Sequence, residues 1–231
     1  MPVDPATSPS GLPEAVVFDF DGLLIDSEWA IFETAVAAFA AHGHTLSTEA
    51  WATIIGTSAD DDPTWWATVC QAAGITGFSQ ADFETAYEAQ PRDRNDIPLL
   101  PGAVELLDEL GAAGVPVGVA SSSSRAWLQR HTARHGLTER FATLVGSDVV
   151  GGVGKPAPDV YLKACADLGA DPRRSVALED SAHGTTAAKA AGMAVVAVPS
   201  RLTVHNDFSH ADLVVDSLVG LSLDQLRALV A

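Results

Sequence analysis

Two aspartates placed two positions apart are the first residues of this sequence that could do chemistry. Asp19 and Asp21 stand in the stretch VVFDFDGLLIDSE, residues 16–28, after an apolar run and before a glycine. An Asp-x-Asp-Gly sequence is often only a turn, because aspartate and glycine both favour turn conformations. A calcium-binding loop begins in the same way, but it needs an oxygen ligand and a glycine where this chain has Leu23 and Leu24. Other residues must therefore decide what the pair does.

Three further polar groups follow apolar segments later in the chain. VASSSS carries four serines at 121–124, GKPAPD carries Lys155, and SVALED ends in Glu179 and Asp180. Each group taken alone has a plainer interpretation, since serines and acids commonly cap helices and a lysine before proline can be a solvated loop residue. Their shared position after strand-like segments favours a common site.

The segments that must position these residues alternate in the rhythm of βα units. Strand-like stretches are expected at 15–20, 115–121, 142–148, 175–180 and 193–198, and helices at 101–114, 124–136, 157–169 and 182–192. Short apolar strands separated by helices predict a mostly parallel sheet covered on both faces. The fold class is therefore α/β, with a Rossmann-like core.

Residues 29–97 have a different texture, with helix-like pieces and no convincing strand. They predict an α-helical cap domain inserted into the core, which comprises residues 13–28 and 98–231. Residues 1–12 read as a flexible tail. A cap on two connections implies a lid motion, with hinges expected near 24–30 and 95–101.

In an open parallel sheet, ligands bind beyond the carboxyl ends of the strands, where the four polar groups are expected to meet. A carboxylate beside a phosphate is repelled by about 4 kcal/mol at a separation of about 4 Å, so the site needs cations. Mg²⁺ suits oxygen ligands and substrate phosphate, while Lys155 adds a charge and Ser121 a hydroxyl donor. These are the requirements of phosphoryl transfer.

Composition narrows the class of partner. The chain has 231 residues, 47% of them apolar, and no apolar run approaches the roughly 20 residues of a membrane span. A net charge of −17 argues against nucleic acid or an anionic membrane and favours a small ligand. A cytoplasmic monomer or weak homodimer is expected. The two cysteines, Cys70 and Cys165, are interpreted as buried apolar side chains.

With these residues in place, the chain resembles the haloacid dehalogenase superfamily, in its phosphatase branch and β-phosphoglucomutase-like subgroup with a small helical cap. Four stretches carry the resemblance in order: FDFDGLLIDSE, VASSSS, GKPAPD and LEDSAHGTTAAKAAG. Together they cover essentially the whole chain beyond the tail.

The resemblance implies a role for each matching residue. Asp19 resembles the nucleophile that forms an aspartyl phosphate, and Asp21 the general acid and base. Mg²⁺ would be held by Asp19, the backbone carbonyl of Asp21 and Asp180, with Glu179 in support. The phosphoryl group would be bound by Ser121, Ser122 and Lys155.

This sequence differs from three other branches of the superfamily, and the differences argue against the reactions of those branches. Its dehalogenases lack the second aspartate, and its phosphonate-cleaving members use a cap lysine that residues 29–96 do not contain. Its sugar phosphomutases have a histidine and an arginine where this chain has Ile31 and Ala59. The cap is also acidic, with aspartates at 60–62 and only Arg92 and Arg94 as cations, both near the hinge, so it would hold a second phosphate poorly. The prediction is a Mg²⁺-dependent phosphatase acting on a small phosphorylated metabolite, such as a sugar or polyol phosphate.

Two alternatives stay open: a sugar phosphomutase, and a catalytically silent binding protein with the same fold. Aromatic residues and histidines are further candidates for the site. Trp29 is the aromatic residue expected to contact substrate, whereas Trp51, Trp65 and Trp66 are expected to fill the cap core. His183 follows the second acidic pair and could line the site. His131 and His135 have zinc-like spacing but are expected on a solvated helix face.

Overall fold

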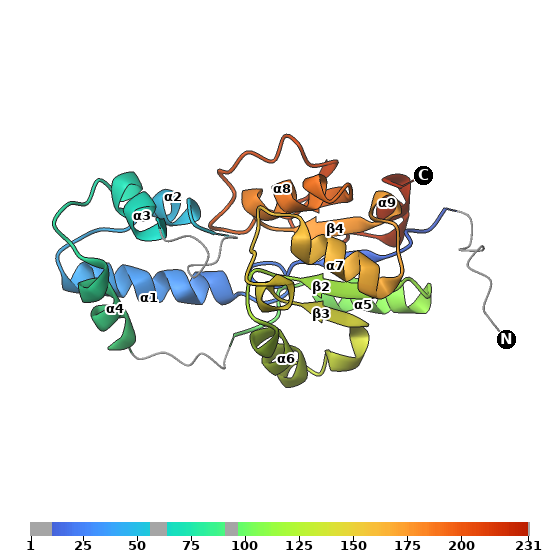
Figure 1. Cartoon of the computed structure of the whole chain (residues 1–231), viewed down its shortest axis with the longest axis horizontal. Coiled ribbons are helices and arrows are strands. Elements are labelled where there is room, and N and C mark those ends of the chain that lie inside the picture. Colours follow the sequence, from blue (N-terminus) through green and yellow to red (C-terminus); the bar gives the residue numbers. More distant parts are fainter. Residues whose placement is uncertain (1–10, 56–63, 91–96, 231) are drawn as a thin grey trace.

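A six-stranded parallel sheet forms the centre of the structure, a computed structural model that describes residues 11–55, 64–90 and 97–230 (Figure 1). The strand order is β3-β2-β1-β4-β5-β6. The strands are β1 Val16–Phe18, β2 Val117–Ala120, β3 Thr143–Val145, β4 Val176–Glu179, β5 Ala194–Ala197 and β6 Leu213–Val214. The predicted α/β fold class is confirmed.

Strand β1 lies between β2 and β4, with Phe18 opposite Val119 on one side and Leu178 on the other. Its side chains alternate between two hydrophobic clusters: Val16 and Phe18 belong to one, and Val17 to the other. A central parallel strand is buried on both faces, which explains why its sequence is apolar without alternation.

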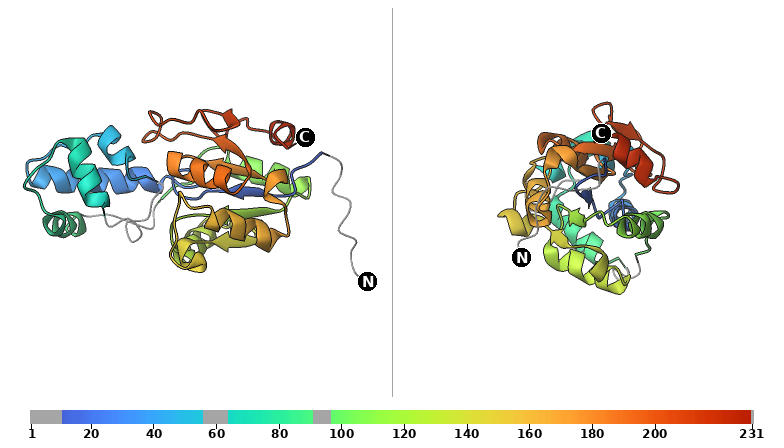
Figure 2. Two further views of the ribbon diagram at one scale, coloured as in Figure 1. Left: turned by 45° about the horizontal axis from the view of Figure 1, so that its top comes forward. Right: turned by 90° about the vertical axis from the view of Figure 1, so that its right-hand side faces the viewer.

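Helices cover both faces of this sheet (Figure 2). The cluster of Val16 and Phe18 includes residues of α5 Ala103–Ala112, α6 Arg125–Arg134 and α9 Leu223–Ala228. The cluster of Val17 includes residues of α7 Asp159–Leu168 and α8 Ala182–Ala190. Short 3₁₀ helices, η1 Thr138–Arg140, η2 Ser147–Val150 and η3 Pro172–Arg174, occupy connections between these elements.

In the described part of the segment between β1 and α5, four helices form a separate unit, which we call the cap: α1 Ser27–Ala41, α2 Thr48–Ala52, α3 Trp65–Ala73 and α4 Gln80–Glu88. The cap has its own hydrophobic cluster, in which the ring of Phe39 contacts Phe78 and Phe83. Trp51 is buried in this cluster and Trp65 packs against it, as expected. Helix α1 begins two residues before the predicted cap boundary at 29.

The two connections between core and cap run side by side. Ile25 pairs with Leu99, the amide of Asp26 donates to the Pro98 carbonyl at 3.0 Å, and the amide of Leu100 donates to the Leu24 carbonyl at 2.9 Å. These residues fall within the expected hinges, and the hinge motion stays a prediction. A third contact comes from the core, because Leu202 is buried inside the hydrophobic cluster of the cap.

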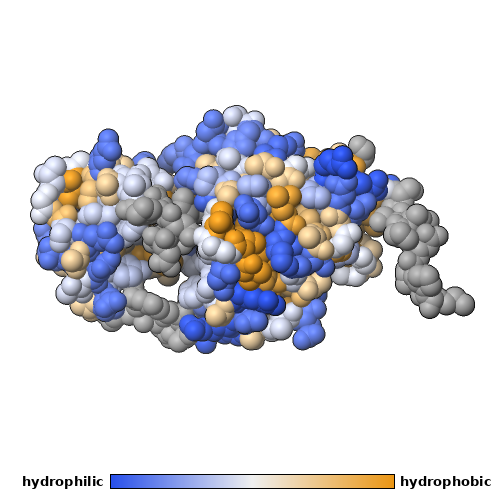
Figure 3. Space-filling view, viewed as in Figure 1, coloured by the Kyte–Doolittle hydropathy of each residue, from blue (hydrophilic) through white to orange (hydrophobic). Residues whose placement is uncertain are grey.

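The N-terminal residues, the cysteines and the surface were also subjects of expectation. Of the expected tail, residues 1–10 lie outside the described residues, and Leu12 packs against the core. Both cysteines are free and buried, as interpreted. Figure 3 shows hydrophilic residues over much of one face, and hydrophobic residues gather mainly over the core. No helix in the described ranges has the length and apolar character needed to cross a membrane.

His131 corrects one expectation. It lies on α6, but its side chain is buried instead of solvated, and its ring packs against Trp127 with 4.0 Å between ring centroids. Burial lowers the pKa of His131, which favours the neutral imidazole. Helical periodicity turns this position toward the sheet, and the spacing of two histidines could not reveal that.

Candidate active site

The carboxyl ends of three neighbouring strands bring together three of the predicted residues. Asp19 follows β1, Ser121 follows β2 and Asp180 follows the last residue of β4. The register places Phe18 beside both neighbouring strands, so the residues that follow each strand meet at one edge. The predicted convergence of these side chains is thus observed.

Lys155 reaches this edge from the loop between β3 and α7. Its Nζ donates to Oδ1 of Asp19 and to Oε1 of Glu179, both at 2.5 Å, and its backbone amide donates to Oγ of Ser122 at 3.2 Å. The side chain is 1% exposed. Burial alone would lower the pKa of Lys155, but the two carboxylates raise it overall, so the ammonium group stays charged.

Glu179 orients its neighbours with both carboxylate oxygens. Oε1 also accepts from the Tyr161 hydroxyl at 2.7 Å, while Oε2 accepts from the backbone amides of Asp180 and Ser181 at 3.1 and 3.3 Å. The close approach requires a glycine at 184, because a Cβ there would lie 1.9 Å from Oε1. Glu179 therefore holds Lys155 and the Asp180 loop in place, in line with a supporting role.

Asp180 provides a test of whether the site suits a cation. Its Oδ2 is buried without a hydrogen-bond partner in the structure, and oxygens of Asp19, Glu179 and Asp180 lie within 4.8 Å of one another. Burial, followed by the charges of Asp19 and Glu179, raises the pKa of Asp180 well above its usual value. For Asp19, burial outweighs the opposing effect of Lys155 and raises the pKa to about 8. An excess of buried carboxylates with an unsatisfied oxygen fits a hard divalent cation.

Gly22 allows the first aspartate loop to pass next to Asp180. Its φ is 86°, and a Cβ at this position would lie 2.3 Å from Oδ2 of Asp180. The turn closes when the Gly22 amide donates to the Ile25 carbonyl at 2.9 Å. Glycine tolerates this left-handed conformation and leaves room for the carboxylate.

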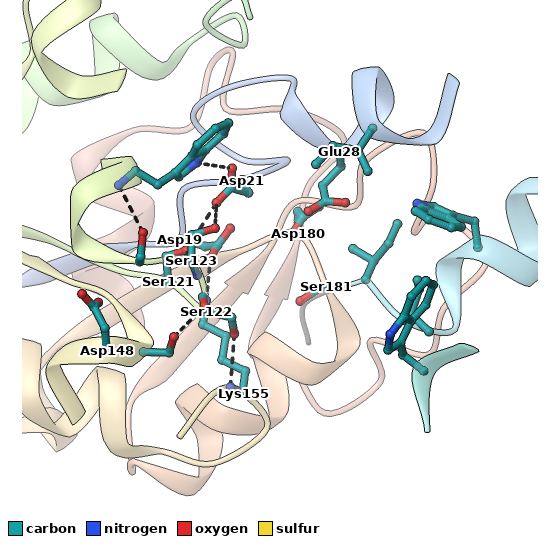
Figure 4. Close-up of a pocket in the computed structure, with 18 of the residues that line it drawn as sticks. Asp19, Asp21, Glu28, Ser121, Ser122, Ser123, Asp148, Lys155, Asp180 and Ser181 are labelled. Atoms are coloured by element: carbon teal, nitrogen blue, oxygen red, sulfur yellow. Dashed lines mark hydrogen bonds and ion pairs between the residues drawn. The ribbon is translucent and has the colours of Figure 1, made fainter. Parts of the chain in front are cut away.

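The Asp21 carboxylate accepts hydrogen bonds from three elements of the fold. Ser27 Oγ and Trp127 Nε1 donate to Oδ1 at 2.7 and 3.0 Å. Ser123 Oγ donates to Oδ2 at 2.7 Å, and Ser121 Oγ approaches it at 3.4 Å. The serine run has two roles, because its last member, at 124, caps α6. Figure 4 shows Asp19 and Asp21 close to these serines.

Several residues of the site were missed from sequence. Ser27, Ser123 and Trp127 hold Asp21, and Glu28 turns its carboxyl group toward Asp180 (Figure 4). Burial first, and then the charges of Asp21 and Asp19, raise the pKa of Glu28 to about 8. Ser27 and Glu28 belong to the first motif as written in the sequence, so their position there was the available signal. Trp127 had no comparable signal.

A cavity of about 680 Å³ opens beside these residues, between core and cap. Its described lining comprises Asp19, Asp21, Glu28, Ile31, Trp51, Ile54, Ile55, Trp65, Phe83, Tyr87, Ser121, Ser122, Ser123, Ser124, Trp127, Ser147, Asp148, Gly152, Lys155, Asp180 and Ser181. The cap contributes mainly apolar and aromatic side chains. Among the described lining residues, Lys155 is the one basic side chain.

Two lesser candidates lie outside this lining. The Trp29 indole donates to Oε1 of Glu33 at 2.8 Å, and its ring lies 4.0 Å from the guanidinium carbon of Arg201. Trp29 therefore lies outside the described cavity lining, because its position in α1 turns the ring toward Arg201. His183 instead lies 3.0 Å from the Ile55 carbonyl through Nδ1, so it links core to cap.

Comparisons with known proteins confirm the resemblance to the haloacid dehalogenase superfamily. Residues 13–192 match the family model described as haloacid dehalogenase-like hydrolase. The chain is 31% identical to the putative phosphatase YhcW of Bacillus subtilis, over 93% of this chain and 98% of that protein. It is 32% identical to a probable pseudouridine-5'-phosphatase of Drosophila melanogaster, over 90% and 91% of the two chains.

A solved structure gives the same picture at the level of the fold. The crystal structure of CbbY from Rhodobacter sphaeroides in complex with phosphate aligns with a TM-score of 0.69 and 28% identity. The alignment covers 93% of this chain and 99% of the other. Core and cap are thus both present in that relative.

Proposed function

The chain belongs to the haloacid dehalogenase-like hydrolases, and from that premise we propose that it is a phosphatase that hydrolyses a small phosphorylated metabolite. The observation that carries the proposal is the arrangement of Asp19, Lys155 and Asp180 at one sheet edge under a cavity. Several similar proteins bear phosphatase names, among them one named (DL)-glycerol-3-phosphatase 1 in Arabidopsis thaliana. We favour a sugar or polyol phosphate as the substrate.

In the first step, Asp19 attacks the phosphorus atom and the bond to the leaving oxygen breaks. Lys155 and Ser121 bind the phosphoryl oxygens, and Asp21 gives a proton to the leaving alcohol. In the second step, Asp21 takes a proton from water, the water oxygen bonds to phosphorus, and the bond to Asp19 breaks. The products are an alcohol and inorganic phosphate, and Asp19 is regenerated.

The cation is proposed to be Mg²⁺, held by Asp19, Asp180 and the backbone carbonyl of Asp21. When bound, it offsets the negative charge that accumulates between the phosphate and the carboxylates. Glu179 already pairs with Lys155 and the Asp180 loop, so it supports this set without needing to bind the ion.

Water is proposed as the final acceptor of the phosphoryl group, in place of a sugar hydroxyl. Ile31, at the position of the mutases' histidine, lines the cavity with an apolar side chain, and Lys155 is the one basic residue in the described lining. A second phosphate would therefore lack a second basic partner among the described lining residues. Ala59 lies outside the described residues, as do the acidic positions 60–62 and Arg92 and Arg94.

Phosphate release from a panel of phosphomonoesters, with Mg²⁺ and with chelator, tests the proposal. Asp19→Asn is expected to lower the rate at least about 10³-fold, because an amide cannot act as the nucleophile. Asp216→Asn, at an exposed position, is the matched control and should keep full activity. Metal-independent release, or full activity in the Asp19 variant, would refute this mechanism. Interconversion of phosphate positions without release would favour the mutase.

A further inference from the structure

Trp127 contacts the Asp21 carboxyl group from the core of the protein. Its Nε1 lies 3.0 Å from Oδ1 of Asp21, and the ring borders the cavity. Trp127 stands in the first turn of α6, where its backbone amide donates to Oγ of the capping residue Ser124 at 3.3 Å. The helix cap therefore fixes the backbone from which the indole projects.

The orientation of the indole is also fixed by its packing. Its ring lies against His131, with 4.0 Å between centroids and an interplanar angle of 47°. His131 is fully buried, and neither of its ring nitrogens has a hydrogen-bond partner in the structure. In this position His131 acts as a packing surface that keeps the indole N–H directed at Asp21.

The indole differs in chemistry from the other groups around Asp21. The hydroxyls of Ser27, Ser121 and Ser123 can rotate and either donate or accept, whereas an indole N–H can only donate. When Asp21 carries a proton, its carbonyl oxygen is a better acceptor than its hydroxyl oxygen. The fixed N–H at Oδ1 therefore favours the form in which the proton is on Oδ2.

Oδ2 is the oxygen that faces the proposed phosphate-binding side. Ser123 Oγ lies 2.7 Å from it and Ser121 Oγ 3.4 Å from it, both from the loop after β2. The geometry points to Trp127 as a positioning residue that directs the acidic proton of Asp21 to Oδ2, toward the leaving oxygen of the substrate. This inference rests on the proposed function, because it assigns a partner to the proposed general acid.

The proton is conserved through the cycle. In the first step the Oδ2–H bond breaks, the leaving oxygen gains the proton, and Asp21 keeps the negative charge, with Trp127 still donating to Oδ1. In the second step a proton from the attacking water returns to Oδ2. Trp127 itself neither gains nor loses a proton, so it is not a catalytic acid.

Leaving-group dependence distinguishes this role from a structural one. Trp127→Phe keeps an aromatic ring but removes the donor. Replacement by 3-benzothienylalanine, in which sulfur takes the place of N–H, preserves the shape as well. For an alkyl phosphate, which needs a proton on its leaving oxygen, both changes should lower kcat/KM about 10- to 100-fold, as part of the typical contribution of a general acid. For 4-nitrophenyl phosphate, whose leaving group needs little protonation, the loss should stay below about 3-fold.

Trp29→Phe is the matched control, because it removes an indole N–H that donates to another carboxylate, Glu33, outside the cavity lining. This substitution should leave kcat/KM unchanged for both esters. Equal losses of kcat/KM for both esters in the benzothienyl variant would indicate a structural role and overturn the inference. Unchanged values for both esters would overturn it too.

A measurement without turnover separates this inference from the proposed function. The Trp127 indole N–H resonance, assigned by its loss in Trp127→Phe, should shift in Asp21→Ala while that of Trp29 stays in place. An unmoved Trp127 resonance would refute the hydrogen bond. If the resonance shifts but wild-type protein releases no phosphate from either ester, the proposed function fails and the positioning role fails with it, although the hydrogen bond stands.

Discussion

Lys155 compensates two buried carboxylates at once, Asp19 and Glu179, through contacts of 2.5 Å. Burying these three charges costs free energy, because each of them loses its hydration. Removing the cation would leave both acids next to each other without a counterion. The ion pairs that position Lys155 for its proposed contact with phosphate thus also make it a structural residue.

Lys155→Met is therefore expected to abolish phosphate release and to lower the free energy of unfolding by about 3 kcal/mol. Lys163→Met is the matched control, since Lys163 pairs with Asp167 four residues along α7 and its side chain is 41% exposed. The control should cost less than about 1 kcal/mol. Urea unfolding measures the stability of both variants, and phosphate assays measure their activity. Equal unfolding free energies for the two variants would contradict the compensating role.

Sequence alone predicts the residues that directly follow strands. Asp19, Ser121 and Asp180 could be assigned because parallel strands end at one edge of a sheet. Trp127 could not, since its contact with Asp21 depends on the direction in which α6 leaves the sheet. Glu28 was also missed, because its role depends on the buried carboxylates that surround it.

At the scale of elements, the loop from Asp19 to Asp26 places the first motif against Asp180, a proposed metal ligand. Its tight turn depends on Gly22, and its far end pairs with residues 98–100 before α1 begins. The turn therefore joins the sheet edge of the candidate site to the connection that leads into the cap. A substitution in the turn is therefore expected to displace the Asp180 side chain.

Gly22→Ala should destabilise the fold and weaken Mg²⁺ binding, because its Cβ would collide with Asp180 Oδ2. Gly43→Ala shares the left-handed conformation, with φ of 76°, but meets no atom within 4 Å. The control should cost only about 1–2 kcal/mol of backbone strain and leave Mg²⁺ affinity unchanged. Urea unfolding and calorimetric Mg²⁺ titration separate the two effects. Equal Mg²⁺ affinity in both variants would count against this placement of Asp180.

Most strands and helices of the core were predictable, whereas two elements near the end of the chain were not. The central strand lies in a continuous apolar run and the helices that cover it have apolar periodicity, so their existence followed from the sequence. Strand β6, with two residues, and α9, with six, were not predicted. β6 pairs with β5 and α9 places Leu226 in the core cluster, so both short elements depend on contacts with the rest of the core.

At the scale of the whole molecule, acidic residues dominate the net charge, and several of them lie close together in the candidate active site. The net charge is −17, and Asp19 and Glu28 both have pKa values raised to about 8 by burial. In the unfolded chain such groups titrate near 4. Between these values the folded protein holds protons that the unfolded chain has released.

The metal-free protein is therefore expected to lose stability as the pH rises from 5 to 8, since the folded state binds more protons over this range. Mg²⁺ competes with those protons, so its stabilising effect should grow with pH. Thermal unfolding from pH 5 to 8.5, with Mg²⁺ and with chelator, measures both trends. Asp19→Asn should flatten the slope seen in chelator. A Tm that rises with pH in chelator would rule out the raised pKa values.

The sequence by itself determined the fold class, the order of the motifs and the acidic residues at the strand ends, because apolar periodicity and the polarity of parallel strands are local properties of the chain. Only the tertiary structure decided which hydroxyl and indole groups hold Asp21, that Trp29 faces Arg201, and that His131 is buried. Those outcomes depend on how α1 and α6 are oriented over the sheet edge. Helix orientation results from packing between segments about 100 residues apart, such as Trp127 against Asp21, and no local pattern records it.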